Sequence, residues 1–275
     1  MAKLDKTNLT KTQIKILLQE KRNKKLAKTH QKNLKDKGPF ANNILVLKHG
    51  KKYGPEYVNK MYKMVSKHCT LPFNFYCLTE NSDGLEKEIN VIPLPIMNVE
   101  GWWYKPYIYS KDLPIEGTIL YIDLDMVIVD DIDKFFTYEP NRYCVLRDFT
   151  RAMRPKWEKY NSSLVRFKKG QLDDVWEEFK RNPDVITRRL FGDQDYLFEK
   201  TRGQATLWPD SWCLSWKWEI RQNKMFKAGG TKGNRVFDKI EHCEAPPACS
   251  IIAFHGDPNP HRCEDPFIID NWHKI

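Results

Sequence analysis

The stretch GTILYIDLDMVIVDDID, residues 117–133, contains a run of apolar and aromatic residues that ends in two closely spaced carboxylates. Residues 119–122 (ILYI) form the continuous apolar run that is typical of a central strand in a parallel sheet. Asp123 and Asp125 follow at positions i and i+2, so in an extended chain both side chains point to the same side. Ligands of open α/β sheets bind beyond the carboxyl ends of the strands, and the pair therefore marks a candidate site.

Three interpretations of this pair compete. The first is a solvated strand end with two incidental acids. The second is a site for Mg²⁺ or Mn²⁺, which bind through one or two carboxylates together with substrate phosphates. The third is a phosphatase, because DLDMV resembles the D-x-D-x-[VT] signature of the haloacid dehalogenases, with Asp123 as nucleophile and Asp125 as acid/base.

Two observations narrow the interpretation of Asp123 and Asp125, one concerning calcium and one concerning the phosphatase. A calcium loop of EF-hand type is excluded, because Val127 stands at the third ligand position and no Gly stands at the sixth. Haloacid dehalogenases usually begin with the strand that carries their signature, whereas more than 120 residues precede it here.

Strand-like segments alternate with helix-like segments from residue 43 onward, which predicts an α/β fold with a mostly parallel central sheet. The predicted strands are NILVLKHG (43–50), FNFYCLTE (73–80), INVIPLP (89–95), GTILYIDLD (117–125), NRYCVLRD (141–148), NSSLVRFK (161–168) and CSIIAFHG (249–256). The predicted helices are PEYVNKMYKMVSKH (55–68), LDDVWEEFKRN (172–182) and DQDYLFEKT (193–201), each with apolar residues at helical spacing.

Charge divides the chain of 275 residues into two parts. Residues 1–38 contain 12 Lys/Arg and 3 Asp/Glu, a net charge of +9, whereas the remainder carries only +1. We therefore predict a basic N-terminal arm, helical or partly disordered, over residues 1–38 and one domain over residues 39–275. The arm is either a solvated extension or a contact for DNA, another polyanion or an anionic membrane surface.

The remaining composition indicates a cytoplasmic protein. No stretch approaches the roughly 18 consecutive apolar residues of a membrane span, and the Lys-rich N-terminus lacks the apolar region of a secretory signal. The seven cysteines are odd in number and form no C-x-x-C pair, so reduced thiols are expected. A zinc site among His242, Cys243, Cys249, His255, His261 and Cys263 would match no standard tetrahedral spacing.

The order of motifs resembles nucleotide-sugar glycosyltransferases of the GT-A fold, especially family 8 and its phage-type relatives, over roughly residues 43–262. The segments that carry the resemblance are ILVLKHGKKYGPEYV, FYCLTE, WWYKPYIYS, LYIDLD, YNSSLVRF, GDQDYLF and IIAFHGDPNP. One departure is that family 8 members usually have a Lys shortly after the His-x-G, where this chain has His261 and Arg262.

The resemblance implies a GT-A fold, a nucleotide-diphosphate sugar as donor, most simply a UDP-sugar, and Mn²⁺ or Mg²⁺ as cofactor. It implies metal binding by Asp123, Asp125 and His255, and a catalytic segment formed by Asp193, Gln194 and Asp195. The donor-binding residues that it implies, besides Asp123, are His49, Gly50, Tyr53, Thr79, Lys105, Asn161, Ser162, Lys217 and Gly256. Retention at the anomeric carbon is also implied.

Several of these residues have a structural interpretation as well. His255 could be a hydrogen-bonded residue at a strand end, and Asp193 or Asp195 could cap the helix that follows Gly192. Asn161 and the two serines after it also suit a turn. The four tryptophans of WPDSWCLSWKW (208–218) are either core or a stacking platform, and core is favoured.

The sequence thus predicts sugar transfer from a nucleotide-diphosphate sugar to a hydroxyl acceptor. The acceptor stays open between a modified (hydroxymethylated) base in phage DNA, a lipid-linked sugar and a protein hydroxyl. If the chain is phage-encoded, the host cytoplasm is its expected location. A phosphatase and a non-catalytic DNA-binding protein are the alternatives from other classes, and the oligomeric state is not indicated.

Overall fold

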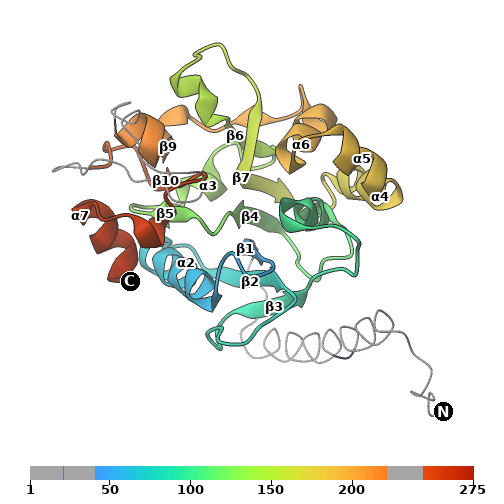
Figure 1. Ribbon diagram of the computed structural model, residues 1–275, viewed down its shortest axis with the longest axis horizontal. Coiled ribbons are helices and arrows are strands. Elements are labelled where there is room, and N and C mark those ends of the chain that lie inside the picture. Colours follow the sequence, from blue (N-terminus) through green and yellow to red (C-terminus); the bar gives the residue numbers. More distant parts are fainter. Residues whose placement is uncertain (1–20, 22–40, 222–243) are drawn as a thin grey trace.

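The computed structural model describes residue 21, residues 41–221 and residues 244–275 (Figure 1). The predicted basic arm, apart from Lys21, lies outside the described residues, as do His242 and Cys243 of the zinc alternative. The division at residues 38 and 39 stays a prediction.

A main sheet of seven strands forms the centre of the described part, in the order β3-β2-β1-β4-β7-β6-β8. Neighbouring strands are parallel except on the two sides of β7, which runs antiparallel to β4 and to β6. The strands are β1 (Asn42–Lys48), β2 (Phe73–Thr79), β3 (Asn90–Pro93), β4 (Thr118–Ile122), β6 (Cys144–Arg147), β7 (Tyr160–Lys168) and β8 (Thr206–Leu207).

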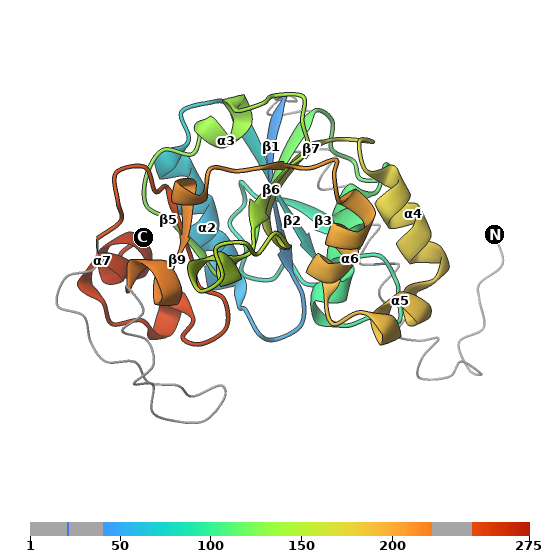
Figure 2. The same ribbon diagram turned by 90° about the horizontal axis from the view of Figure 1, so that it is seen from above.

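Helical layers cover both faces of this sheet (Figure 2). One face packs against α2 (Pro55–His68), which begins with a proline and buries one apolar side that includes Met61, Met64 and Val65. The other face packs against the 3₁₀ segment η1 (Gly101–Tyr109), α4 (Asp173–Arg181) and α6 (Asp193–Thr201). Each layer buries its own hydrophobic cluster, so the sheet is apolar on both sides, as its continuous apolar runs predict.

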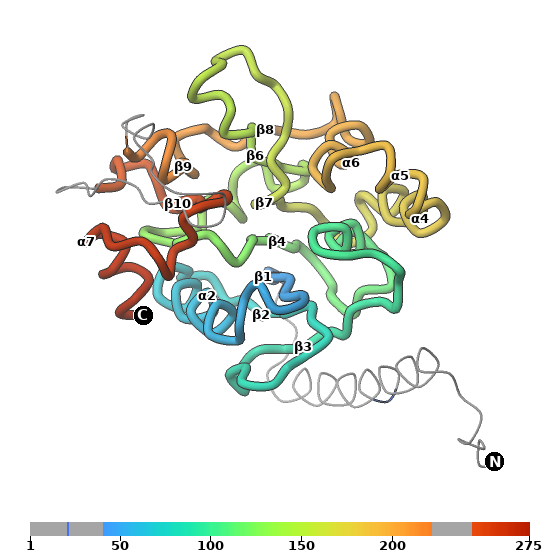
Figure 3. Tube along the Cα trace, viewed as in Figure 1, coloured from blue at the N-terminus to red at the C-terminus, as the bar shows by residue number. Residues whose placement is uncertain are grey.

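A second sheet of three strands extends from the end of β4. Its order is β5-β10-β9, with β5 (Met126–Ile128) antiparallel to β10 (Ile251–Ala253) and β9 (Cys213–Ser215) parallel to β10. The segments α7 (Pro266–Ile268) and η7 (Ile269–His273) follow β10, and the chain then ends beside α2 (Figure 3). The remaining short elements are α3 (Lys134–Thr137), η2 (Phe149–Ala152), α5 (Pro183–Arg189), η3 (Asp210–Trp212), η4 (Trp216–Ile220) and η6 (Pro260–Arg262).

A β-bulge interrupts the pairing of β6 with β7. Val145 stands opposite Val165, but the next residue, Leu146, stands opposite Asn161. Three residues of β7, 162–164, therefore have no counterpart on β6 in this register. In Figure 3 the chain leaves β6 in a long loop and returns as β7.

The predicted α/β class and mostly parallel sheet are confirmed, and each strand and helix predicted from residue 43 onward corresponds to an observed one. The predicted strand 117–125 is too long, because β4 ends at Ile122 and a turn follows. Neither the three-stranded sheet nor α5 was predicted. The tryptophans of segment 208–218 belong to the core: Trp208 and Trp216 are 2% exposed, and the other two pack against the same cluster.

Two further expectations concern cysteines and membrane spans. Among the described residues, six cysteines are free thiols. Within the described ranges, every helix is too short or too polar to span a bilayer.

Candidate active site

The turn after β4 sets the positions of the two aspartates. The N–H of Asp123 donates to the carbonyl of Ser163 on β7 (2.8 Å), and the N–H of Met126 donates to the carbonyl of Asp123 (3.3 Å). The carbonyl of Asp125 accepts from the N–H of Phe254, just beyond β10 (3.0 Å). The carboxylates are therefore placed by a turn that joins the two sheets, and not by the side-alternation of an extended strand.

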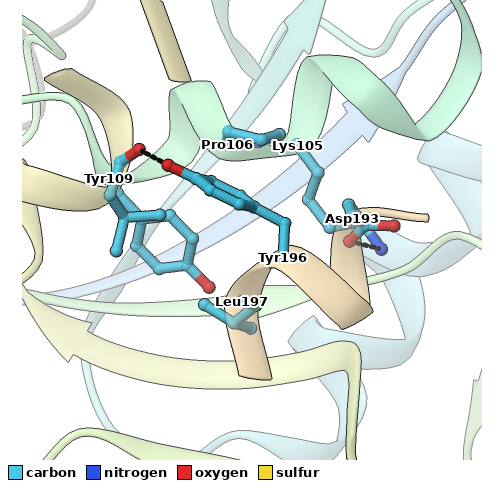
Figure 4. Close-up of a pocket in the computed structure, with 7 residues that line it drawn as sticks. Lys105, Pro106, Tyr109, Asp193, Tyr196 and Leu197 are labelled. Carbon is cyan, nitrogen blue, oxygen red and sulfur yellow. Dashed lines mark hydrogen bonds and ion pairs between the residues drawn. The ribbon is translucent and has the colours of Figure 1, made fainter. Parts of the chain in front are cut away.

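Lys105 lies at the centre of a charged cluster on the η1 side of this turn. Its Nζ is 3.0 Å from Oδ2 of Asp123, 3.1 Å from Oγ of Ser162 and 3.4 Å from Oδ2 of Asp193. Ser162 in turn donates to Asp193 (2.6 Å), and the hydroxyl of Tyr121 donates to Oδ1 of Asp123 (2.6 Å). We call these five residues the Lys105 cluster; Figure 4 shows the contact between Lys105 and Asp193.

Charge pairing favours the ammonium form of Lys105 although this side chain is largely buried. Burial alone would lower the pKa of Lys105, but the charges of Asp123 and Asp193 outweigh it and hold the pKa above its ordinary value. Burial raises the pKa of Asp193, and Lys105 and Ser162 offset part of that rise. The side chain of Asp123 is 22% exposed, so the cluster opens to solvent at this carboxylate.

Asp125 lies beside the cluster in a different environment. Its Oδ2 accepts a hydrogen bond from Tyr53 (2.9 Å), whose hydroxyl is also 3.3 Å from Oδ1 of Asn259. Burial, together with the charge of Asp123, raises the pKa of Asp125 to about 6. The charge of Asp123 thus acts against ionisation of Asp125, and the charges of Lys52 and Lys105 offset this only in part.

His255 lies beyond the end of β10, as predicted, but in an aromatic setting. Its ring stacks on Phe149 at 5.0 Å and meets the edge of Trp218 at 4.5 Å. Its Nε2 is 2.6 Å from Oγ of Ser215. Burial and the charges of Lys217 and Arg151 lower its pKa to about 3, so the imidazole is neutral at physiological pH.

The residues present fit a divalent cation in part. Two adjacent carboxylates, one with a raised pKa, form an oxygen-rich site whose mutual repulsion a cation would relieve. His255 is not gathered with them, since no three His, Cys, Asp or Glu side chains of the described residues lie close enough together to hold a metal ion. The same finding holds for the described members of the zinc alternative.

The predicted nucleotide-binding residues lie at the carboxyl ends of β1 and β2. Glu80 ties the two loops together, because its carboxylate accepts from the N–H of Gly50 (2.8 Å) and lies 3.4 Å from Nδ1 of His49. The ring of His49 is 4.4 Å from that of Tyr104. Thr79 is fully buried, and within the described part of the chain its hydroxyl donates to the carbonyl of Asn81 and accepts from its N–H, both at 3.0 Å.

The other predicted residues divide between the cluster and its surroundings. The side-chain oxygen of Asn161 accepts a hydrogen bond from the N–H of Ser163 (3.0 Å), as the structural interpretation of this residue predicts. Asp195 pairs with Lys159 (2.9 Å), and Gln194 is half-buried in the same first turn of α6. Neither Asp193 nor Asp195 caps α6, because the N-cap residue is Gly192, which has no side chain to accept a hydrogen bond.

The side chain of Lys217 contacts the backbone of the loop after β10. Its Nζ donates to the carbonyl of His255 and lies 3.5 Å from that of Asp257. Gly256 has a left-handed φ of +82°, and a Cβ there would lie 3.2 Å from Nζ of Lys217. Lys217 and Gly256 are thus together, beside His255 and apart from the Lys105 cluster.

Sequence reasoning missed the partners of the predicted residues. Tyr121 carried a usable signal, because it stands two residues before Asp123 on the same side of the chain. Glu80 closes the quoted segment FYCLTE, but nothing in its spacing links it to His49. Ser215 and Asn259 come from distant segments, and we see no signal for them in the sequence.

No family model matches this sequence, and no curated protein matches it. Its fold matches solved structures. The glycosyltransferase GlyE of Streptococcus pneumoniae TIGR4 is 12% identical, with a TM-score of 0.60 over 84% of this chain and 60% of that chain. An active-site mutant of LgtC is 12% identical, with a TM-score of 0.55 over 82% of this chain and 91% of that chain. The galactosyltransferase LgtC, in complex with donor and acceptor sugar analogs, is 10% identical, with a TM-score of 0.57 over 85% and 96%.

This chain thus spans about 60% of the length of GlyE and nearly the whole of LgtC. At these identities the likeness concerns the fold, which is the Rossmann-like α/β arrangement of GT-A glycosyltransferases.

Proposed function

We propose that this protein transfers a sugar from a nucleotide-diphosphate sugar to a hydroxyl acceptor. The observation that carries the proposal is the Lys105 cluster beside Asp125, at the carboxyl end of β4 in a sheet of GT-A type. In open α/β sheets this end of the strands is where ligands bind.

Within this proposal, Lys105 and Asp193 bind the donor. The Lys105 ammonium lies between the carboxylates of Asp123 and Asp193, and it would contact the diphosphate once a bound cation offsets those two charges. Asp193 and Ser162 are linked by a hydrogen bond, and they offer acceptors and donors to sugar hydroxyls. Gln194 lies one residue beyond Asp193, and we assign it to the sugar face.

We assign a divalent cation, Mg²⁺ or Mn²⁺, to Asp123 and Asp125. When bound, such a cation neutralises charge on the diphosphate and makes it a better leaving group. His255 supports this assignment only through its neutral imidazole and through the backbone bond that brings Phe254 to Asp125. Its role as third ligand stays a prediction.

The nucleotide would lie against the loops after β1 and β2. The ring of His49, beside Tyr104, and the exposed Gly50 offer a flat and open surface to a base. Tyr53 reaches from this loop to Asp125, so it would connect the base-binding loop to the diphosphate site. UDP as the nucleotide and retention at the anomeric carbon rest on the family resemblance.

The phosphatase alternative finds less support. Both oxygens of Asp123 already have close partners in Tyr121 and Lys105, which does not suit a free nucleophile. A DNA acceptor was suggested by the basic arm, which lies outside the described residues apart from Lys21.

A thermal-shift panel of nucleotide-diphosphate sugars, with and without Mn²⁺, tests the proposal. We expect one nucleotide sugar to raise the unfolding temperature only when Mn²⁺ is present, since a ligand at 100 times its Kd stabilises by about 2.7 kcal/mol. The Asp125→Ala variant should lose that shift. If every sugar nucleotide fails while a generic phosphate ester is hydrolysed, the proposal is wrong and the phosphatase is favoured.

A further inference from the structure

The imidazole of His255 is held in one orientation by three neighbouring side chains. Its face stacks on Phe149, with the ring centroids 5.0 Å apart and the planes 5° from parallel. The ring of Trp218 lies 4.5 Å away at an angle of 71°, and Nε2 lies 2.6 Å from Oγ of Ser215. Since these contacts restrict rotation of the imidazole, each of its two nitrogens keeps its own surroundings.

Ser215 determines which atom donates in its short contact with His255. The residue is fully buried, and its Oγ accepts a hydrogen bond from the N–H of Trp218 (3.1 Å) as the N-cap of η4. The hydroxyl also has one proton to donate, and a buried donor without an acceptor is costly. Within the described part of the chain, Nε2 of His255 is the acceptor that this proton can reach. The hydroxyl of Ser215 therefore donates to Nε2.

This hydrogen bond fixes the tautomer of His255. An Nε2 that accepts a hydrogen bond carries no proton, so the ring is neutral and its proton is on Nδ1. Nδ1 has no hydrogen-bond partner among the described residues, and His255 is only half-buried. The side chain thus offers one N–H donor and no free lone pair, whereas a metal ligand needs a lone pair. The observed contacts therefore disagree with the role of third metal ligand that the family resemblance implies.

The charges around His255 also favour an anionic ligand over a cation. The Nζ of Lys217 donates to the carbonyl of His255 itself. Burial, with the charges of Lys217 and Arg151, lowers the pKa of the ring, and the same positive charges would repel a metal ion. The backbone nevertheless keeps the residue beside the proposed cation site, because the N–H of Phe254 donates to the carbonyl of Asp125 (3.0 Å).

We propose that His255 donates a hydrogen bond from Nδ1–H to the diphosphate of the sugar donor, and that Ser215 is the positioning residue that fixes this tautomer. The identity of the ligand rests on the function proposed above, but the tautomer does not. The two parts are therefore tested by different measurements.

Long-range ¹H–¹⁵N NMR on the full chain, with ¹⁵N-labelled histidine, tests the tautomer, because protonated and unprotonated ring nitrogens resonate far apart. We expect an unprotonated Nε2 and a protonated Nδ1 for His255 at neutral pH. Ser215→Ala should remove this preference, and Ser215→Thr should retain it. His273 is the internal control, because its Nε2 faces the carbonyls of Pro260 (3.2 Å) and Cys263 (3.1 Å) and must carry a proton in every variant. A protonated Nε2 on His255 in the unaltered protein would overturn the assignment.

Binding of UDP in the presence of Mn²⁺ tests the role of Nδ1–H. His255→Asn keeps an N–H near the position of Nδ1 and should bind UDP to within about threefold of the unaltered protein. His255→Asp has no such donor and adds a negative charge, so its affinity for UDP should fall by about tenfold or more. Mn²⁺ binding without nucleotide, measured from the electron paramagnetic resonance of the free ion, should be equal in His255→Ala and the unaltered protein.

The opposite pattern would make His255 a metal ligand. In that case His255→Ala would weaken Mn²⁺ binding without nucleotide, and the carboxylate of His255→Asp would restore it. Equal UDP affinity in His255→Ala and the unaltered protein would overturn the inference while leaving the proposed function intact. Failure of the unaltered protein to bind any nucleotide diphosphate would count against the proposed function and leave the tautomer standing.

Discussion

The Lys105 cluster and the surroundings of His255 both follow the carboxyl ends of strands, yet they treat charge in opposite ways. In the cluster, the ammonium of Lys105 contacts two carboxylates, whose charges hold its pKa above the ordinary value. Around His255, burial and the charges of Lys217 and Arg151 favour the neutral imidazole, and its pKa falls to about 3. We call the Lys105 cluster with Asp125 the charged half of the site and the surroundings of His255 the neutral half. The charged half has three carboxyl groups for one ammonium, so in the proposed function a cation would have to offset them before a diphosphate binds.

The largest effect is expected at Asp125. Asp125→Ala removes a carboxylate from the proposed cation site, and we expect metal-dependent transfer to fall by about 10³-fold or more. The measurement is release of the nucleotide diphosphate in the presence of Mn²⁺. Asp130→Asn, at an exposed acid of the same stretch, is the control. Full activity of Asp125→Ala would refute the proposal that Asp125 binds the cation.

Lys105→Met should lower the free energy of unfolding of the protein. The substitution leaves Asp193 buried without its cation, and breaking a buried pair from one side destabilises by about 3–5 kcal/mol. Urea unfolding at neutral pH measures the change. Lys159→Met is the matched control, because Lys159 pairs with Asp195 at the surface and should contribute about 1 kcal/mol or less. Equal losses of unfolding free energy in the two variants would contradict the expected difference between the buried pair and the surface pair.

Tyr121→Phe should have an intermediate effect. It removes the 2.6 Å hydrogen bond to Asp123, and hydrogen bonds to charged groups contribute about 1.5–3 kcal/mol. Combining it with Asp123→Asn in a double-mutant cycle isolates the interaction between the two side chains. A coupling free energy near zero would remove Tyr121 from the cluster.

The smallest effects per unit of pH are two opposite slopes, one from each half. The pKa of His255 is lowered from 6.5 to about 3, so the unfolded chain binds the proton first and stability falls as the pH drops through that window. The pKa of Asp125 is raised from 3.8 to about 6, so the folded chain binds its proton first and stability rises as the pH drops through that window. Each slope is at most about 1.4 kcal/mol per pH unit.

Unfolding in chelator across pH 3–7 separates these slopes. His255→Gln should flatten the loss of stability in acid, and Asp125→Asn should steepen it. Unchanged slopes in both variants would show that neither group is buried as described.

The sequence predicted the strands because their apolar runs are long, and it singled out Asp123 and Asp125 because two acids after such a run are unusual. It could not predict that β4 stops at Ile122, since Asp123–Asp125 fits an extended strand equally well by pattern. The antiparallel β7 and the sheet formed by β5, β9 and β10 depend on pairings between distant segments, which periodicity does not encode. The same limit hid Ser215, the partner of His255.

The β-bulge between β6 and β7 affects the direction in which the side chain of Ser162 points. Residues 162–164 have no counterpart on β6, so pairing with β6 does not constrain which way Ser162 turns, although β4 still pairs with Leu164; the hydroxyl of Ser162 accepts from Lys105. Side chains in a regular strand alternate between faces, so we expect deletion of one residue from this segment to send the serine to the other face. Here the length of the chain, more than the identity of its residues, determines where the hydroxyl points.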